Sequence, residues 1–163
     1  MTRTLILLRH GKSAYPDGVA DHERPLAPRG RREAGLAGRW LRANQPPIDA
    51  VLCSTAVRTR KTLAEAAIEA PVDYRDDLYD TTPDILVAAV RAVRDDVTTL
   101  LVVGHEPSLS RTALLLAPDH DSEAAHQLAE KFPTSAVAVL TVRGAWHELE
   151  AGRAELTDFH IPR

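Results

Sequence analysis

Short apolar runs alternate along the chain with longer segments in which apolar residues recur at helical spacing. The short runs predict buried strands, and the spaced segments predict amphipathic helices. The expected strands are residues 4–8, 49–53, 72–75, 98–103 and 136–142. The expected helices are residues 31–43, 56–69, 107–116 and 124–131, together with one that starts at Thr82 and Pro83 and buries Ile85, Leu86, Ala89, Val90 and Val93.

Other segments do not follow either pattern. Residues 17–32 are rich in glycine, proline and charge and predict a loop that leads into a helix. At residue 82 a threonine hydroxyl is expected to cap the helix, with Pro83 in its first turn. Residues 117–123 predict a loop, and residues 146–159 predict an edge hairpin or strand pair.

The order of these elements predicts the fold class. Strands that alternate with helices form an α/β protein, here a three-layer α/β/α sandwich around a mainly parallel sheet. No internal repeat, low-complexity tract or linker interrupts the sequence. We therefore expect residues 1–163 to form a single domain.

Composition narrows the class of protein further. A chain with 44% hydrophobic and 26% charged residues is typical of a soluble globular protein, and its net charge of −3 favours neither nucleic acid nor an anionic membrane as partner. The N-terminal apolar run is too short for a signal peptide, and no run approaches the ~20 residues of a membrane span. We expect a cytoplasmic protein. Cys53, the only cysteine, lies in an apolar run and predicts a buried structural thiol.

Three of the predicted strands end in residues suited to binding phosphate. The first ends in Arg9-His10-Gly11, the second leads into a helix that carries Arg58, and a later strand ends just before His105. Ligands in open α/β sheets gather at the carboxyl ends of strands, so these residues are expected to meet. Arginine matches phosphate oxygens in a bidentate way, and a neutral imidazole can act as a nucleophile. The pattern predicts phosphoryl transfer to His10.

The same segments resemble the histidine phosphatase superfamily, which has the phosphoglycerate mutase-like fold. Residues 8–13 (Leu-Arg-His-Gly-Lys-Ser) resemble its Arg-His-Gly signature, residues 54–59 its Ser-x-x-x-Arg-x block, and Gly104-His105 its second histidine. Residues 21–26 with Gly30, and residues 132–136, are similar to the SixA-like phosphohistidine phosphatases of that superfamily. The resemblance covers nearly the whole chain, with the blocks in order.

This resemblance implies a phosphatase that works through a phosphohistidine formed on His10. Arg9 and Arg58 would hold the phosphate, and His105 would complete the cage and stabilise the transition state. Water would then hydrolyse the intermediate. The resemblance implies no metal and no other cofactor.

Additional residues are candidates for contacts with the substrate and for proton transfer. The expected substrate contacts are Gly11, Ser13 and Arg24; Ser13 can equally be a residue that shapes its loop, and for Arg24 a salt bridge within the loop is the slightly favoured alternative. The candidate proton donors are Asp77, Asp80 and Glu106, and Glu106 is better explained as a structural or orienting group.

The lack of a dedicated acid directs the choice of substrate. Larger members of the superfamily take an acid from an inserted region, for which this chain has no evident room. A phosphorylated imidazole can carry a proton on its other nitrogen and leave as neutral imidazole, so it needs little help. We therefore expect a phosphohistidine on a partner protein as substrate. The alternatives are a small-molecule phosphomonoesterase for sugar or nucleotide phosphates, and a non-catalytic phosphate-binding module; a mutase is disfavoured because no lid is evident.

Overall fold

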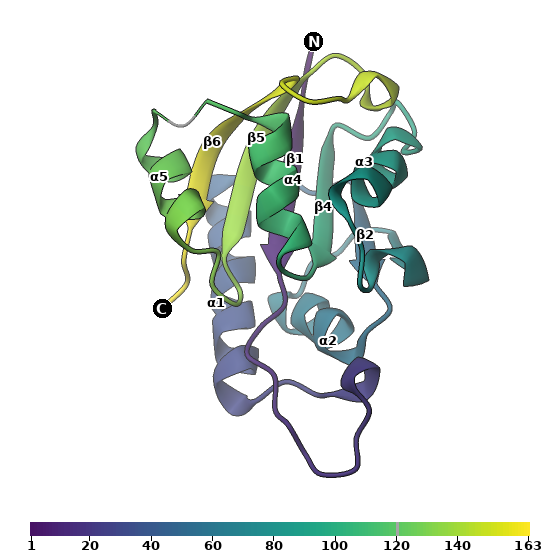
Figure 1. The fold of residues 1–163 in the computed structure, drawn as a ribbon, viewed down its shortest axis with the longest axis vertical. Coiled ribbons are helices and arrows are strands. Elements are labelled where there is room, and N and C mark those ends of the chain that lie inside the picture. The colour runs from purple at the N-terminus through teal and green to yellow at the C-terminus, as the bar shows by residue number, and fades with distance from the viewer. Residues whose placement is uncertain (120) are drawn as a thin grey trace.

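Six strands form one mixed sheet within residues 1–119 and 121–163, the parts of the chain that the computed structural model describes (Figure 1). The strands are β1 (Thr2–Arg9), β2 (Ala50–Ser54), β3 (Val72–Arg75), β4 (Thr99–Gly104), β5 (Val137–Arg143) and β6 (Ala154–His160). Their order is β3-β2-β4-β1-β5-β6. The pairs β1–β4, β4–β2 and β2–β3 are parallel, whereas β5 and β6 are added antiparallel at one edge. The predicted, mainly parallel sheet is therefore confirmed.

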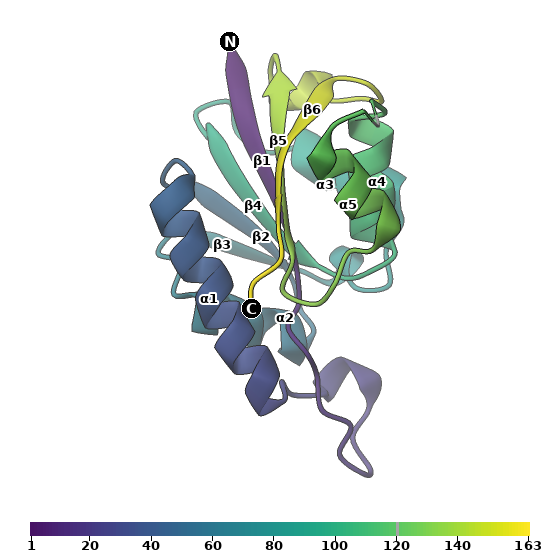
Figure 2. The same ribbon diagram turned by 90° about the vertical axis from the view of Figure 1, so that its left-hand side faces the viewer.

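Helices cover both faces of this sheet. The helices are α1 (Pro28–Asn44), α2 (Val57–Ala66), α3 (Pro83–Arg91), α4 (Ser108–Leu116) and α5 (Glu123–Glu130). Figure 2 shows α1 and α2 on one side of the sheet and α3, α4 and α5 on the other. This arrangement is the predicted three-layer α/β/α sandwich.

The central strands bury side chains on both faces. Along β1, Leu5 and Leu7 belong to one apolar cluster, and Ile6 and Leu8 belong to another. Successive side chains of a strand point to opposite faces, so a strand between two helical layers needs an unbroken apolar run. The fully buried strand β4 follows the same rule. These two runs position the chain segments that follow β1 and β4 at one edge of the sheet.

Some predicted boundaries differ from the structure. Helix α1 begins at Pro28 rather than residue 31, because proline is well suited to the first helical position. Ile85 is 40% exposed instead of buried, since the core side of α3 consists of Leu86, Ala89 and Val90 and Ile85 lies outside that arc. The hydroxyl of Thr82 does not cap α3; it donates to the Asp84 carboxylate.

The predicted hairpin over residues 146–159 is wrong in its first half. Residues Trp146–Glu148 form a 3-10 turn, and only β6 forms a strand, paired with β5. The indole of Trp146 is fully buried, and its Nε1 donates to the carbonyl of Val97 at 2.7 Å. A buried indole N–H needs an acceptor. The bond to Val97 anchors the segment in a turn, so it does not pair as a strand.

The structure also bears on membrane-spanning helices, on Cys53 and on clusters of potential metal ligands. In the described part of the chain, no helix has the length and apolarity to cross a membrane. Cys53 is buried, and burial raises the pKa of its thiol to about 12, so it is a structural thiol. Among the same residues, no three His, Cys, Asp or Glu side chains gather as potential metal ligands.

Candidate active site

His10 directly follows β1, at the edge where the parallel strands end. Its backbone N–H donates to the carbonyl of Gly104 at 3.1 Å, and its carbonyl accepts from the N–H of Ser135 at 3.1 Å. The ring is 8% exposed, and its Nδ1 lies 2.7 Å from the carbonyl oxygen of Gly11. A carbonyl only accepts, so in the neutral ring Nδ1 carries the proton and Nε2 carries the lone pair.

The surroundings of His10 keep its ring neutral. Burial lowers the pKa of His10 to about 4; the bond to Gly11 opposes this shift, and the positive charges of Arg9, Arg58 and Arg24 add to it. The ring is therefore neutral at pH 7, with its single proton on Nδ1. A buried neutral imidazole with a free Nε2 and guanidinium groups around it is suited to attack a phosphoryl group.

His105 follows β4 and faces His10. The ring centroids are 5.3 Å apart, and Nε2 of His105 lies 2.9 Å from the hydroxyl oxygen of Ser54 at the end of β2. Burial lowers the pKa of His105 to about 3, and His10 and Arg58 lower it further. Negative charge between the two rings would raise this pKa, because an opposite charge favours the protonated imidazole.

Hydrogen bonds through Thr62 connect α2 to the segment after β1. The N–H of Gly11 donates to the hydroxyl of Thr62 at 2.8 Å, and that hydroxyl donates to the carbonyl of Arg58 at 2.7 Å. The guanidinium of Arg58 is buried and donates to both the carbonyl (2.7 Å) and the carboxylate (3.1 Å) of Asp21. Arg58 is thus fixed at its backbone by Thr62 and at its guanidinium by Asp21.

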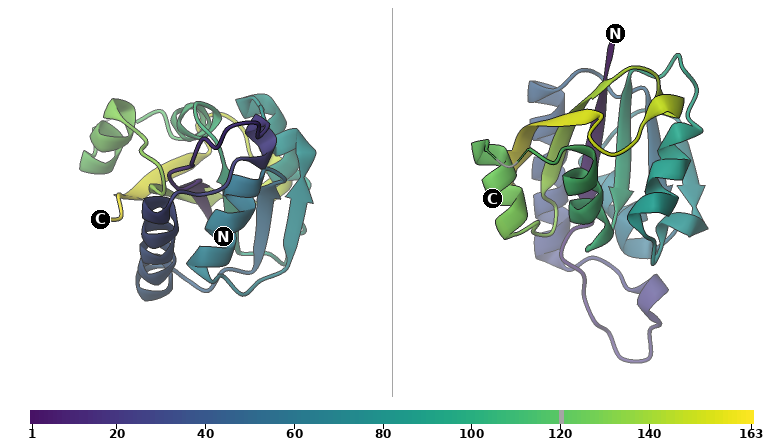
Figure 3. Two further views of the ribbon diagram at one scale, coloured as in Figure 1. Left: turned by 90° about the horizontal axis from the view of Figure 1, so that it is seen from below. Right: turned by 45° about the horizontal axis from the view of Figure 1, so that its top comes forward.

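Asp21 lies on the loop between β1 and α1, which protrudes at the same end of the sheet (Figures 1 and 3). Its carboxylate also accepts from Arg24 at 2.6 Å and from the hydroxyl of Tyr79 at 2.5 Å. The Tyr79 hydroxyl, followed by Arg24 and Arg58, holds the pKa of Asp21 well below its usual range. One carboxylate therefore positions two arginines that lie close enough to His10 to lower its pKa.

Arg24 and Ser13 are also joined within this loop. Arg24 donates to the hydroxyl of Ser13 and to the carbonyl of Ala14, and its guanidinium lies 3.8 Å from the centre of the Tyr15 ring. Ser13 is buried and pairs with Leu26 across the loop. Both residues thus shape the loop, and Arg24 also contributes positive charge to the site.

Arg9 and Gly11 have structural contacts of their own. Arg9 donates to the carbonyl of Phe132 at 2.9 Å, which fixes its partly buried guanidinium beside the two histidines. A Cβ on Gly11 would lie 2.7 Å from the carbonyl oxygen of Gly30. We expected glycine here for access to phosphate; its close packing on the start of α1 is a second reason.

The three candidate acids are placed differently from one another. Both carboxylate oxygens of Glu106 accept from Ser110, from its N–H at 2.7 Å and its hydroxyl at 2.8 Å, within the first turn of α4. Asp77 is exposed and pairs with Arg75 at 2.7 Å. Asp80 is exposed, and no hydrogen bond or ion pair within the described residues joins it to the histidines. The structure does not bring Asp77 or Asp80 into the charged network around His10.

Sequence reasoning missed two members of this network. Asp21 lies within the motif of residues 21–26, but its role was not recognised; the Asp-x-x-Arg spacing to Arg24 was the available signal. Tyr79 touches His105 edge-on, with ring centroids 5.6 Å apart, and donates to Asp21. Nothing local in the sequence marks Tyr79, because its partners are 26 and 58 residues away.

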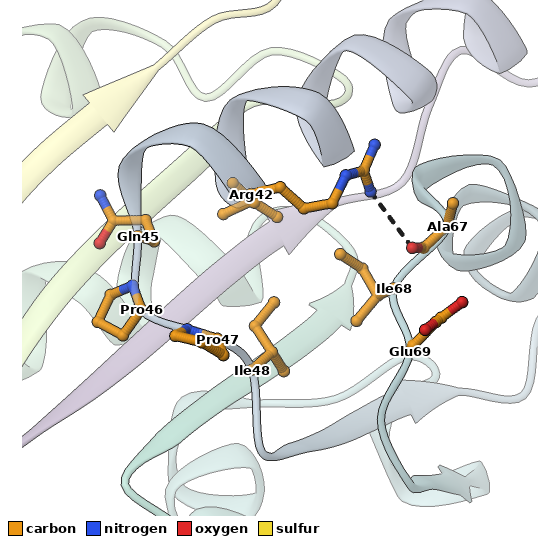
Figure 4. Close-up of a pocket in the computed structure, with 9 residues that line it drawn as sticks. Arg42, Gln45, Pro46, Pro47, Ile48, Ala67, Ile68 and Glu69 are labelled. Carbon is orange, nitrogen blue, oxygen red and sulfur yellow. Dashed lines mark hydrogen bonds between the residues drawn. The ribbon is translucent and has the colours of Figure 1, made fainter.

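A hollow lies elsewhere on the molecule. It has a volume of about 540 Å³ and is lined by the C-terminal end of α1 and by the segments that follow α1 and α2, including Pro46, Ile48 and Ile68 (Figure 4). Gly30 at the other end of α1 packs against the backbone of Lys12, roughly 20 Å away at 1.5 Å per helical residue. The charged network around His10 is therefore distinct from this apolar hollow.

The chain is similar in sequence to a known family and to mycobacterial proteins. A family model described as the histidine phosphatase superfamily (branch 1) matches residues 5–82. The uncharacterised protein Rv1276c of Mycobacterium tuberculosis (strain H37Rv) is 58% identical over 158 residues, which cover 96% of this chain and 100% of that protein.

Solved structures match over nearly the whole chain. A structure assigned as the phosphohistidine phosphatase SixA from Nakamurella multipartitia has a TM-score of 0.92 and 43% identity, and the match covers 99% of this chain and 97% of that one. The protein histidine phosphatase SixA complexed with tungstate has a TM-score of 0.80 and 25% identity, with 98% and 97% covered. The expected fold family and the phosphatase class are confirmed. The chain belongs to the histidine phosphatase superfamily.

Proposed function

We propose that this protein removes the phosphoryl group from a phosphohistidine on a partner protein, through a phosphohistidine formed on His10. The hydrogen bond of 2.7 Å between Nδ1 of His10 and the carbonyl of Gly11 carries the proposal, because it leaves Nε2 as the nucleophilic atom. The pKa of about 4 keeps that atom unprotonated at neutral pH. The proposal assigns the activity to residues 1–163 as one domain, acting in the cytoplasm.

In the first step, Nε2 of His10 attacks the phosphorus of the substrate. A P–N bond forms on His10 while the substrate's P–N bond breaks, and the bonding electron pair goes to the nitrogen of the partner's imidazole. That imidazole keeps a proton on its other nitrogen and leaves neutral. His10 keeps its own proton on Nδ1, donated to Gly11. Because one P–N bond replaces another, the two sides of this step are close in energy.

In the second step, water attacks the phosphorus on His10. The new P–O bond replaces the P–N bond, the electron pair returns to Nε2, and the protons of the water remain with the released phosphate. Phosphoryl transfer depends mainly on positioning and on charge stabilisation at the oxygens. Arg9, Arg58 and the neighbouring His105 supply that charge, and Arg24 and Ser13 complete the substrate-binding side of the site.

The placement of the acids supports this choice of substrate. An alkoxide leaving group needs a proton donor, whereas a protonated phosphoimidazole does not. Both carboxylate oxygens of Glu106 accept hydrogen bonds from Ser110, and Asp80 is exposed and lies outside the charged network around His10. The likeness to SixA structures, one of them holding tungstate, favours the same substrate class and a tetrahedral oxyanion at the site.

An activity panel tests this proposal. The purified protein is offered a phosphohistidine peptide, an aryl phosphate and sugar phosphates, with His10→Ala and the exposed His126→Ala as matched variants. We expect the peptide to give the highest kcat/KM, loss of about 10⁴-fold or more in His10→Ala, and full activity in His126→Ala. Faster hydrolysis of sugar phosphates than of the peptide would make the protein a small-molecule phosphomonoesterase. Equal inactivity of wild type and His10→Ala, with phosphate still bound, would make it a binding module.

A further inference from the structure

A row of arginines lies along the solvent side of α1. Arg31, Arg32, Arg39 and Arg42 are exposed, and with Gly35 they line a shallow hollow of about 390 Å³ that also includes Glu65 of α2. At 3.6 residues per turn these positions fall within an arc of about 100°. The opposite side of α1 packs on the sheet through Ala37 and Leu41. We call these four residues the α1 arginine strip.

The α1 arginine strip contrasts with those surface arginines that have acidic partners. Arg24, Arg75, Arg94 and Arg153 each pair with a nearby Asp or Glu. Within the described residues, no ion pair is made by any member of the strip. Four positive charges face one negative charge at Glu65, although the whole chain carries −3. Such a local field attracts an acidic ligand.

The strip begins beside the active site. Gly30, the residue before Arg31, packs against the backbone of Lys12, two residues after His10. From Arg31 to Arg42 the strip extends about 16 Å along α1. Five or six extended residues of a bound chain span the same length. A protein segment with its phosphohistidine at His10 can therefore reach the strip without a long connection.

We propose that the α1 arginine strip binds an acidic segment of the phosphohistidine-bearing protein, within about ten residues of the phosphorylated side chain. This inference rests on the proposed function and adds the kind of partner that the enzyme selects. Guanidinium groups pair well with carboxylates, and exposed charges of this kind act on association rate and selectivity more than on final affinity. The strip thus favours acidic partners over neutral ones.

Two sets of peptides test the strip directly. Each peptide carries one phosphohistidine and a tract of six residues, placed either before or after it, made of Glu in one set and of Gln in the other. At 50 mM salt we expect the better Glu peptide to exceed its Gln counterpart in kcat/KM by about three- to tenfold, and the ratio to fall towards one at 500 mM salt. Glu and Gln peptides hydrolysed equally well at low salt would overturn the proposal.

Variants of the strip sharpen the result. Arg42 is left in place because it donates to the carbonyls of Ala66 and Ala67 at the end of α2, the latter bond being drawn in Figure 4. In R32Q/R39Q the Glu preference should fall at least threefold, and R32E/R39E should prefer a Lys tract. The control R94Q/R111Q removes two exposed positive charges at α4 and after α3 and should keep the wild-type preference. Equal loss in the control would overturn the assignment to α1.

Aryl phosphate hydrolysis separates this proposal from the one on which it rests. The small substrate does not reach the strip, so R32Q/R39Q should hydrolyse it at the wild-type rate. If no phosphohistidine peptide is hydrolysed while the aryl phosphate is, the proposed function itself fails. Binding of a 12-nucleotide RNA at 150 mM salt that is abolished in R32Q/R39Q would show that the strip serves nucleic acid, and would overturn the acidic-protein partner.

Discussion

The two histidines and the arginines around them are held in different ways. His10 and His105 are buried and fixed by a backbone carbonyl and by the hydroxyl of Ser54. Arg58 and Arg24 are instead held by Asp21, whose side chain is 52% exposed. Burial therefore sets the protonation of His10, the proposed nucleophile, while a loop in contact with solvent sets the positions of the charges proposed to receive the phosphate.

This difference indicates which property each region can change. The protonation of a buried imidazole is altered only by changing its burial or its neighbours. The Asp21 carboxylate is half exposed, so solvent screens its ion pairs and the loop can shift without unfolding the protein. We infer that substitutions at the histidines affect chemistry and the pH dependence of stability, whereas substitutions in the loop affect substrate binding.

The largest effect in this comparison is expected at Arg58. Arg58→Gln removes a charge that stabilises the phosphoryl oxygens in the transition state, and we expect kcat/KM to fall by about 10²–10³-fold. Arg60→Gln, an exposed position on the same helix, is the matched control and should stay near wild type. Steady-state kinetics with an aryl phosphate measure both. A loss below about fivefold in Arg58→Gln would remove Arg58 from the proposed cage.

The next effect concerns the pH dependence of stability. The unfolded chain protonates His10 below about pH 6.5, whereas the folded chain does so only below about pH 4. His10 therefore leaves the free energy of unfolding unchanged above pH 6.5, lowers it as pH falls from 6.5 to about 4, and lowers it no further below pH 4. Urea unfolding at pH 7 and at pH 4.5 measures this decrease. Between these two pH values, we expect the free energy of unfolding to fall by about 2 kcal/mol less in His10→Gln than in wild type. Parallel losses would show that His10 is not held neutral by the fold.

A smaller effect is expected at Asp21. Asp21→Asn keeps the size of the side chain but removes the charge that holds Arg58 and Arg24. We expect about a tenfold loss in kcat/KM, mainly through KM, because the arginines remain but are less well positioned. Glu23→Gln, two residues along in the same turn, is the control. An increase in activity would instead show that Asp21 competes with phosphate for the arginines.

The smallest effect is expected at Glu106. Its carboxylate accepts from the N–H of Ser110 and caps the first turn of α4, so Glu106→Ala should lower stability by about 1 kcal/mol. Glu106→Gln should keep kcat/KM within about threefold, measured with both an aryl phosphate and a phosphohistidine peptide. A loss of 10²-fold confined to the aryl phosphate would identify Glu106 as an acid for oxygen leaving groups.

Much of the fold could be predicted from the sequence because its central strands are buried on both faces. Unbroken apolar runs such as residues 100–103 have few alternatives to a buried strand. The errors lie where local pattern and tertiary packing disagree: Ile85 fits a helical apolar spacing but lies outside the core arc, and Trp146 anchors a turn through Val97. Neither contact is visible in the neighbouring sequence.

The residues of the candidate site likewise divide into those that could be predicted from the sequence and those that could not. His10, Arg58 and His105 could be placed together because each follows or lies near the end of a strand, and strand ends meet at one edge. Tyr79 could not, because its place beside His105 depends on a 3-10 turn and on a hydrogen bond to Asp21 across 58 residues. Residues on strand ends are predictable from topology, whereas those on the surrounding loops depend on side-chain contacts.

The central claim, that Nε2 of His10 carries the phosphoryl group, is tested most directly by trapping the intermediate. The protein is mixed with excess phosphohistidine peptide, quenched in alkali to preserve the acid-labile P–N bond, and analysed by peptide mass spectrometry and ³¹P NMR. We expect a phosphoryl group on Nε2 of His10 that forms and decays within the turnover time, and none in His10→Ala. Phosphate on another residue, or turnover by His10→Ala at the wild-type rate, would contradict the account.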